Sequence, residues 1–138
     1  METIKMSKND AASLYNGLVE VKNLKNKAFA LKTAKNMIII KEALEHIEEL
    51  GKPSEEFMKI SMQVQELMNT NSEEGKEKIA ELEKDNAELI EKRKEQMEEV
   101  NTRLLEDIEL NLNKFSEKML PEEITADQIL KLTKIIEE

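Results

Sequence analysis

His46 is the only histidine of the chain, and it lies among closely spaced carboxylates, namely Glu45, Glu48 and Glu49. An imidazole and two carboxylates can bind a divalent cation, but spacings of two and three residues on a helix do not form a recognised zinc motif. The chain has no second histidine and no cysteine to complete a set of ligands. We therefore expect no metal site around His46.

Other residue types that could support catalysis are present without the arrangement that catalysis needs. Adjacent carboxylates, such as those of Glu73 and Glu74 or of Glu98 and Glu99, point in different directions on a helix, so we interpret them as a solvated face. The three glycines are too far apart to form a phosphate-binding loop: Gly17, Gly51 and Gly75. The sequence predicts no catalytic residue, no cofactor and no small-molecule substrate, and we expect that the protein is not an enzyme.

Lysines gather in the first third of the chain: Lys22, Lys25, Lys27, Lys32 and Lys35. Residues 1–41 carry 8 basic and 3 acidic side chains, whereas residues 42–138 carry 13 basic and 27 acidic ones. The basic part could face nucleic acid, an acidic partner or the acidic helix of its own chain, and we favour the last. Aromatic stacking partners are scarce and the overall pI is near 4.9, so we do not expect a nucleic-acid partner.

The strongest structural signal is an apolar stripe that runs through residues 72–104. Its members recur at helical spacing among glutamates and lysines, and we call them the seam: Ile79, Leu82, Leu89, Met97, Val100 and Leu104. A single helix over this range would extend for about 45–50 Å at roughly 1.5 Å per residue. Such a helix needs a partner to cover its stripe. The polar Asn86 and Arg93 lie on the same side, where buried polar residues tend to fix register.

The remaining helices are predicted from caps and breaks. Residues 7–50 form a first helical arm that opens at Ser7, is interrupted near Asn23 and Asn26, and ends where Gly51 can take a left-handed cap. A short helix over 54–68 and a C-terminal helix over 125–137 follow the same rules. Their predicted N-caps are Ser54 and Thr125, the second with Gln128 completing a capping box.

Short strands are predicted near the two ends of the chain. Residues 3–6 alternate in polarity and predict a strand within residues 1–6. A second strand is predicted over residues 105–113, in which Ile108, Leu110 and Leu112 alternate with polar side chains. The second segment also fits a helix, because Leu105, Ile108, Leu112 and Phe115 share a helical face. We favour a strand that pairs with residues 3–6, since an isolated edge segment would leave its backbone groups unsatisfied.

Composition agrees with a helical protein in a reducing compartment. The chain of 138 residues has 37% charged and 3% aromatic residues, with few glycines and prolines, so elements should be few and long. The absence of cysteine excludes disulfides, and no apolar run is long enough for a signal peptide or a membrane span. Eight methionines are typical of adaptable binding surfaces, but we interpret their helical spacing as core filling.

Three groups of residues resemble a family of small uncharacterised helical proteins of tailed phages and prophages of Gram-positive bacteria. They are Ile4-x-Met6-Ser7 with Ala11 and Leu14, the step Ala34-Lys35-Asn36, and the ending from Ile124-Thr125 through Leu130-x-Leu132 to Ile135-Ile136-Glu137-Glu138. The resemblance implies a helical pair flanked by paired terminal strands. It also implies a viral protein that acts in the bacterial cytoplasm or on the particle, and it brings no catalytic residues.

These observations together predict a mainly α fold with one elongated domain over residues 1–138. Its centre is a long antiparallel helical hairpin, coiled-coil-like, with a small terminal β pairing and a C-terminal helix. We expect a non-catalytic protein that binds a second copy of itself, or a phage or host component, through the seam residues Leu82, Leu89, Met97 and Val100. The alternative is an acidic nucleic-acid mimic that inhibits a host defence or regulatory protein.

Overall fold

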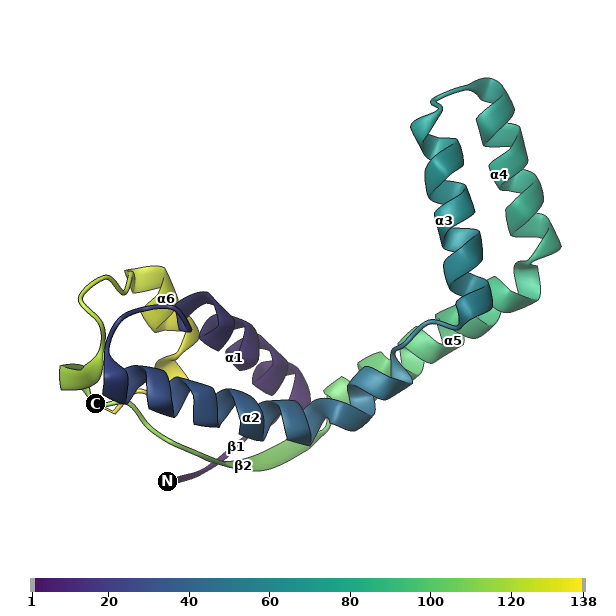
Figure 1. The fold of residues 1–138 in the computed structure, drawn as a ribbon. Coiled ribbons are helices and arrows are strands. Elements are labelled where there is room, and N and C mark those ends of the chain that lie inside the picture. The colour runs from purple at the N-terminus through teal and green to yellow at the C-terminus, as the bar shows by residue number, and fades with distance from the viewer. Residues whose placement is uncertain (1, 138) are drawn as a thin grey trace. The chain divides into compact units, whose positions relative to one another are not determined.

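The computed structural model describes residues 2–137, and it is mainly helical (Figure 1). In chain order the elements are β1 (Glu2–Ser7), α1 (Lys8–Val21), α2 (Lys27–Leu50), α3 (Glu55–Asn69), α4 (Glu73–Asp85), α5 (Ala87–Leu104), β2 (Asp107–Leu112), the 3₁₀ helix η1 (Glu117–Met119), α6 (Ala126–Lys131) and the 3₁₀ helix η2 (Thr133–Ile135). The mainly α fold with a terminal strand pair and a C-terminal helix is confirmed.

The chain divides into two compact units. Unit 1 comprises the residues up to Ile47 and those from Arg103 onward, and unit 2 comprises Glu48–Thr102. Unit 2 is therefore an insertion between two parts of unit 1 in the sequence. That the whole chain forms one domain stays a prediction.

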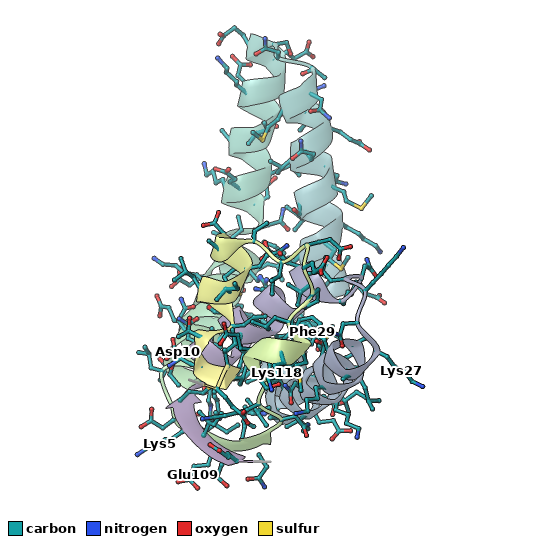
Figure 2. All side chains as sticks on the ribbon, turned by 90° about the vertical axis from the view of Figure 1, so that its left-hand side faces the viewer. Lys5, Asp10, Lys27, Phe29, Glu109 and Lys118 are labelled. Carbon is teal, nitrogen blue, oxygen red and sulfur yellow. The ribbon has the colours of Figure 1, made fainter. Side chains whose placement is uncertain are left out.

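Strands β1 and β2 pair in antiparallel fashion, as predicted, so residues 105–113 hold a strand rather than a helix. Ile4 lies opposite Leu110 and Met6 opposite Ile108, and these apolar side chains turn toward the core of unit 1. Lys5 lies opposite Glu109, and Figure 2 shows both near the outer edge of the strand pair. One polar face and one apolar face are what the period-two alternation requires.

The core of unit 1 is a single cluster of apolar side chains from both of its sequence segments. Phe29 of α2 and Phe115 are fully buried, with ring centroids 4.6 Å apart. Helix α1 approaches α6 closely at Gly17, which has no side chain. A Cβ added at Gly17 would lie only 3.1 Å from the Cβ of Lys131. The buried members of the cluster are Met6, Ala11, Leu14, Leu18, Val21, Phe29, Ile40, Leu110, Leu112, Phe115, Leu132 and Ile135.

Asn36 joins α2 to the chain just after β2. Its side-chain amide is fully buried, and its Nδ2 donates to the carbonyl oxygen of Asn113 at 2.8 Å. The backbone N–H of Asn113 donates to Asn36 Oδ1, also at 2.8 Å. The amide thus satisfies both backbone groups of Asn113, which the two-stranded pairing leaves without a partner strand.

The predicted helix 72–104 is wrong as one continuous element, because it is two helices divided at Asn86. The side chain and the backbone N–H of Asn86 both donate to the carbonyl oxygen of Leu82, at 2.9 and 3.1 Å. The Asn86 carbonyl oxygen then accepts the N–H of Ile90 at 3.0 Å, the first such bond of α5. Asparagine ends one helix and begins the next because its short amide competes with the helical backbone bonds.

The C-terminal helix is shorter than the predicted range 125–137. Its capping box between Thr125 and Gln128 is confirmed, but α6 ends at Lys131 and a 3₁₀ turn follows. The cause is a competing backbone pairing: Phe115 N–H donates to the Ile135 carbonyl at 2.7 Å, and Glu137 N–H donates to the Phe115 carbonyl at 2.8 Å. These bonds hold Ile136, which has an extended backbone, in a parallel bridge with Phe115.

The first arm is interrupted as predicted, and its two helices are capped. The N–H of Asp10 donates to Ser7 Oγ at 3.0 Å at the start of α1. The N–H of Phe29 donates to Asn26 Oδ1 at 3.0 Å at the start of α2. Within the described residues, no helix has the length and hydrophobicity needed to cross a membrane.

We predict that Asn36→Ala destabilises unit 1 by about 2–4 kcal/mol, because it leaves two partly buried backbone groups of Asn113 without their partners. The shift in the midpoint of urea unfolding, followed by circular dichroism, measures this loss. Asn23→Ala in the exposed turn after α1 is the matched control and should shift the midpoint little. Equal midpoints for the two variants would contradict the role of the Asn36 amide.

Candidate functional site

The four residues predicted to bind a partner all lie in unit 2, but the break at Asn86 separates them. Leu82 belongs to α4, whereas Leu89, Met97 and Val100 belong to α5. Leu82 and Leu89 are half-buried, Met97 is 37% exposed and Val100 is buried. The structure therefore gives a partly covered stripe in two pieces rather than one continuous exposed stripe.

An antiparallel hairpin within unit 2 is formed by α3 and α4, which lie side by side in Figure 1. Its apolar contacts are thin, because every large apolar side chain of α3 and α4 remains at least partly exposed. The half-buried members on α3 are Phe57, Ile60, Val64 and Leu67, and those on α4 are Ile79 and Leu82. The two helices thus bury one narrow contact, and its edges stay in reach of solvent.

Open hollows lie on both sides of this contact. The larger, about 600 Å³, exposes Leu67 and Leu82. The polar residues around them are Gln63, Glu66, Thr70, Lys78, Glu81 and Asp85. The other, about 410 Å³, exposes Val64 and Ile79, with Lys76 and Glu83 as its charged residues. It is lined by Val64, Leu67, Met68, Asn71, Ser72, Lys76, Ile79 and Glu83. Apolar side chains at the bottom of a polar-rimmed groove suit the apolar face of another helix.

Leu89 lies in a third hollow of about 510 Å³ between α3 and α5. Here the predicted partner-facing Arg93 is used within unit 2. Its Nη1 donates to the Gly51 carbonyl at 2.8 Å and to Gln96 Oε1 at 3.0 Å, and its guanidinium carbon lies 5.6 Å from the centre of the Phe57 ring. Arg93 therefore forms an internal contact, through hydrogen bonds and a cation–π interaction, rather than the predicted contact with a partner.

Helix α2 ends at Leu50, as predicted, but not through the expected glycine cap. Gly51 does not take a left-handed conformation, because its φ is not positive. Gln96 Nε2 instead donates to the Leu50 carbonyl at 2.6 Å and to the Lys52 carbonyl at 2.7 Å. Side chains of α5 therefore satisfy the carbonyl groups at the end of α2. In a glycine cap, backbone N–H groups would satisfy such carbonyls instead.

The turn between α3 and α4 is tightly built. Asn71 has a φ of 48°, a left-handed conformation that asparagine tolerates, and Ser72 Oγ accepts the N–H of Gly75 at 3.0 Å to cap α4. A Cβ at Gly75 would lie 2.6 Å from Thr70 Oγ1 and 2.9 Å from the Leu67 carbonyl oxygen. Only glycine fits this position without movement of the turn.

Three exposed methionines on α3 were missed by the interpretation of methionine as core filling. Met58, Met62 and Met68 are 49%, 63% and 60% exposed, so for these three that interpretation is wrong. Met6, in contrast, belongs to the core of unit 1. The signal was available in the sequence, because Met58 and Met62 lie off the helical face that Phe57, Ile60, Val64 and Leu67 define.

His46 lies in unit 1 and contacts a cation rather than a set of carboxylates. Lys8 Nζ is 3.2 Å from His46 Nε2 and donates to Glu106 Oε1 at 3.0 Å. Among the described residues no group of three or more potential metal ligands comes together. The hydrogen bond from Lys8 lowers the pKa of the Glu106 carboxyl, and the nearby charges of Lys8, Arg103 and His46 add to that effect.

The paired carboxylates lie in solvent, where the sequence places them. The side chains of Glu73 and Glu74 are 90% and 79% exposed, and each lies 3.5 Å from a lysine one turn along, Lys76 and Lys78. Exposed i,i+3 and i,i+4 pairs of this kind add little stability. They form a charged helix surface around the apolar hollows.

We predict that Gly75→Ala destabilises the α3–α4 hairpin, although alanine is normally preferred over glycine inside a helix by about 1 kcal/mol. The expected loss is about 1–2 kcal/mol, because the new methyl group displaces Thr70 or the Leu67 carbonyl. Helicity and hydrogen exchange of residues 55–85 measure it. Glu77→Ala, an exposed change on the same helix, is the control, and a Gly75→Ala variant of raised stability would contradict the steric argument.

We also predict a pH-dependent effect of Glu106→Gln. Because folding lowers the pKa of Glu106, its carboxylate adds stability above its ordinary pKa, and this is lost as the pH falls through the lowered value. The difference between the native protein and the variant should therefore be small but measurable at neutral pH and should vanish in acid. Urea midpoints across that range test this, with the exposed Glu117→Gln as control. A difference that grows in acid would contradict it.

Comparison of the chain with protein-family models, with curated proteins and with solved structures finds no match. The resemblance to phage and prophage proteins consequently stays a prediction. What the protein does must be inferred from its residues and their geometry.

Proposed function

We propose that the protein is a non-catalytic binder of another protein, and that the seam of unit 2 is its binding site. The observation that carries this proposal is the half-covered state of Leu82 and Leu89, each of which lines an open hollow with a charged rim. In line with the resemblance noted from the sequence, we place it in a phage or prophage, acting in the bacterial cytoplasm or on the particle.

The energy of such binding would come from the apolar groups at the bottom of the hollows. Covering them gains about 25 cal/mol per Å² of apolar surface before the entropic costs of association. An amphipathic helix is the occupant that fits, since it presents a stripe of apolar side chains to apolar groups that lie within a polar rim. The lysines and glutamates of the rim would favour partners of complementary charge pattern.

A second candidate function is mimicry of nucleic acid by the acidic surface. Unit 2 holds 16 acidic and 8 basic residues, and the carboxylates of α4 are largely exposed. A basic host protein that binds nucleic acid could be held by such a surface. Its binding would weaken steeply with salt, whereas binding through the apolar seam would change little.

The test is affinity capture with the full chain from infected or lysogenic cells, at low and at high salt, using the native protein and Leu89→Asp. We expect a defined partner that survives high salt and is lost with Leu89→Asp, while circular dichroism shows retained helicity. Ala80→Asp adds the same charge at an exposed position of α4 and should capture normally.

Two outcomes would contradict the seam as the binding site. One is a partner that Leu89→Asp captures as well as the native protein does, and the other is an absence of any partner at both salt concentrations. A partner lost at high salt but indifferent to Leu89→Asp would favour the acidic mimic instead.

A further inference from the structure

From Met58 onward, one face of α3 is free of charge within a strongly charged unit. Seen down the helix axis, Met58, Met62, Gln65 and Asn69 form a strip, with Ser61 and Met68 along one side, and all six are exposed. Of the charged residues of α3, Glu56, Lys59 and Glu66 lie off this strip, whereas Glu55 lies on it at its N-terminal end, three residues before Met58. We call the uncharged strip the methionine face, and it is distinct from the half-buried contact between α3 and α4.

The spacing along the methionine face is that of a coiled-coil interface. Met58, Met62, Gln65 and Asn69 are separated by four, three and four residues, the alternation of d and a positions in a heptad. Within the helix, Gln65 Nε2 donates to Asn69 Oδ1 at 3.4 Å. Several exposed methionines on one helix face are unusual unless another protein surface covers them.

We propose that the methionine face is covered by the same face of a second copy of the chain, with the two α3 helices antiparallel. The charges that flank the face select this occupant and this direction. Lys59 and Glu66 both hold e positions, and antiparallel coiled coils place e opposite e. Lys59 of one copy then lies opposite Glu66 of the other, and the twofold symmetry makes this pair twice.

Both charges are available for that pairing. Among the described residues, neither Lys59 nor Glu66 forms an ion pair within the chain, unlike Lys76 and Lys78 of α4, which pair with glutamates on their own helix. A parallel pairing would place Glu66 beside Ser61 and leave Lys59 unpaired. The antiparallel direction alone satisfies both residues.

The same alignment sets the layers of the interface. Met62 of one copy packs on Gln65 of the other, and Met58 packs on Asn69, while Ser61 lies opposite Met68 along the second edge. Polar residues in such layers fix register at a cost in affinity. A helix of 15 residues also buries much less than the roughly 800 Å² per partner of a standard interface, so the dimer belongs to the weak, reversible class.

Electrostatic repulsion disfavours a dimer joined through α4. Unit 2 carries twice as many acidic as basic residues, so its α4 surface repels the same surface of a second copy. The methionine face is where two copies can meet without bringing carboxylates together. Its four central residues, Met58, Met62, Gln65 and Asn69, line neither hollow beside the α3–α4 contact, although Glu66 and Met68 at its edges do. Self-association at this face is inferred independently of the proposed function.

Charge reversal with sedimentation equilibrium tests the proposal on the full chain, from about 10 μM to about 1 mM, a range that covers weak dimers. Lys59→Glu should weaken the dimer about tenfold, because two attractive pairs become repulsive, and Glu66→Lys should do the same. The double variant with both changes should recover the native affinity. An equimolar mixture of the two single variants should form a heterodimer stronger than either homodimer.

Met62→Glu should abolish the dimer while helicity is retained, and Ala80→Glu on α4 serves as the matched control. A native protein that stays monomeric across the whole range would overturn the proposal. So would a dimer that Lys59→Glu and Met62→Glu leave unchanged, or one that the double reversal fails to restore. Leu89→Asp should still dimerise, which separates failure of this proposal from failure of the seam as a binding site.

Discussion

The antiparallel pairing of β1 with β2 is the constraint on which the rest of unit 1 depends. It places Ser7 opposite Asp107, so the chain between them must leave and return to the same pair of residues. Closing so long a loop costs conformational entropy that two strands alone do not offset. The pairing is sustained because its apolar side, with Met6, Leu110 and Leu112, belongs to the same buried cluster as α1 and α2, and because the amide of Asn36 satisfies the backbone just after β2.

Different interactions stabilise the two units. Unit 1 has fully buried aromatic and aliphatic side chains and a continuous core, which is what keeps a small domain folded. The α3–α4 hairpin of unit 2 buries only a narrow contact and relies on caps, a glycine-dependent turn and the bonds from Arg93 and Gln96 to the end of α2. A hairpin with little buried surface and much half-covered apolar surface gains more from a partner than a closed core would.

Local rules predicted the elements well wherever the signal was a cap or an alternation. Ser7, Ser54 and Thr125 each cap the helix that the sequence assigns to them, and the alternation at Ile108, Leu110 and Leu112 predicted β2 and its partner. The failures have tertiary causes. Asn86 divides a stripe that is periodic across it, and the C-terminal helix is cut short by bonds to Phe115, a residue that no local pattern connects with Ile135. The break at Asn86 affected the prediction of the candidate site most, since the stripe assumed to be continuous is divided between two helices.

The distribution of charge decides how the two apolar surfaces of unit 2 can be used. The hollows beside Leu82 and Leu89 are rimmed by glutamate and lysine, so an occupant must match charges as well as fill space. The methionine face carries Glu55 at its N-terminal end and is flanked by Lys59 and Glu66. Lys59 and Glu66 of two copies lie opposite each other only when the two helices run in opposite directions. A charged rim selects a foreign partner, whereas a self-complementary pair selects a copy. Met58, Met62, Gln65 and Asn69 do not line the hollows beside Leu82 and Leu89, so a dimer held by these four residues leaves Leu82 and Leu89 uncovered in each copy. Two linked seams would bind a partner with repeated sites more tightly than one, without any additional contact.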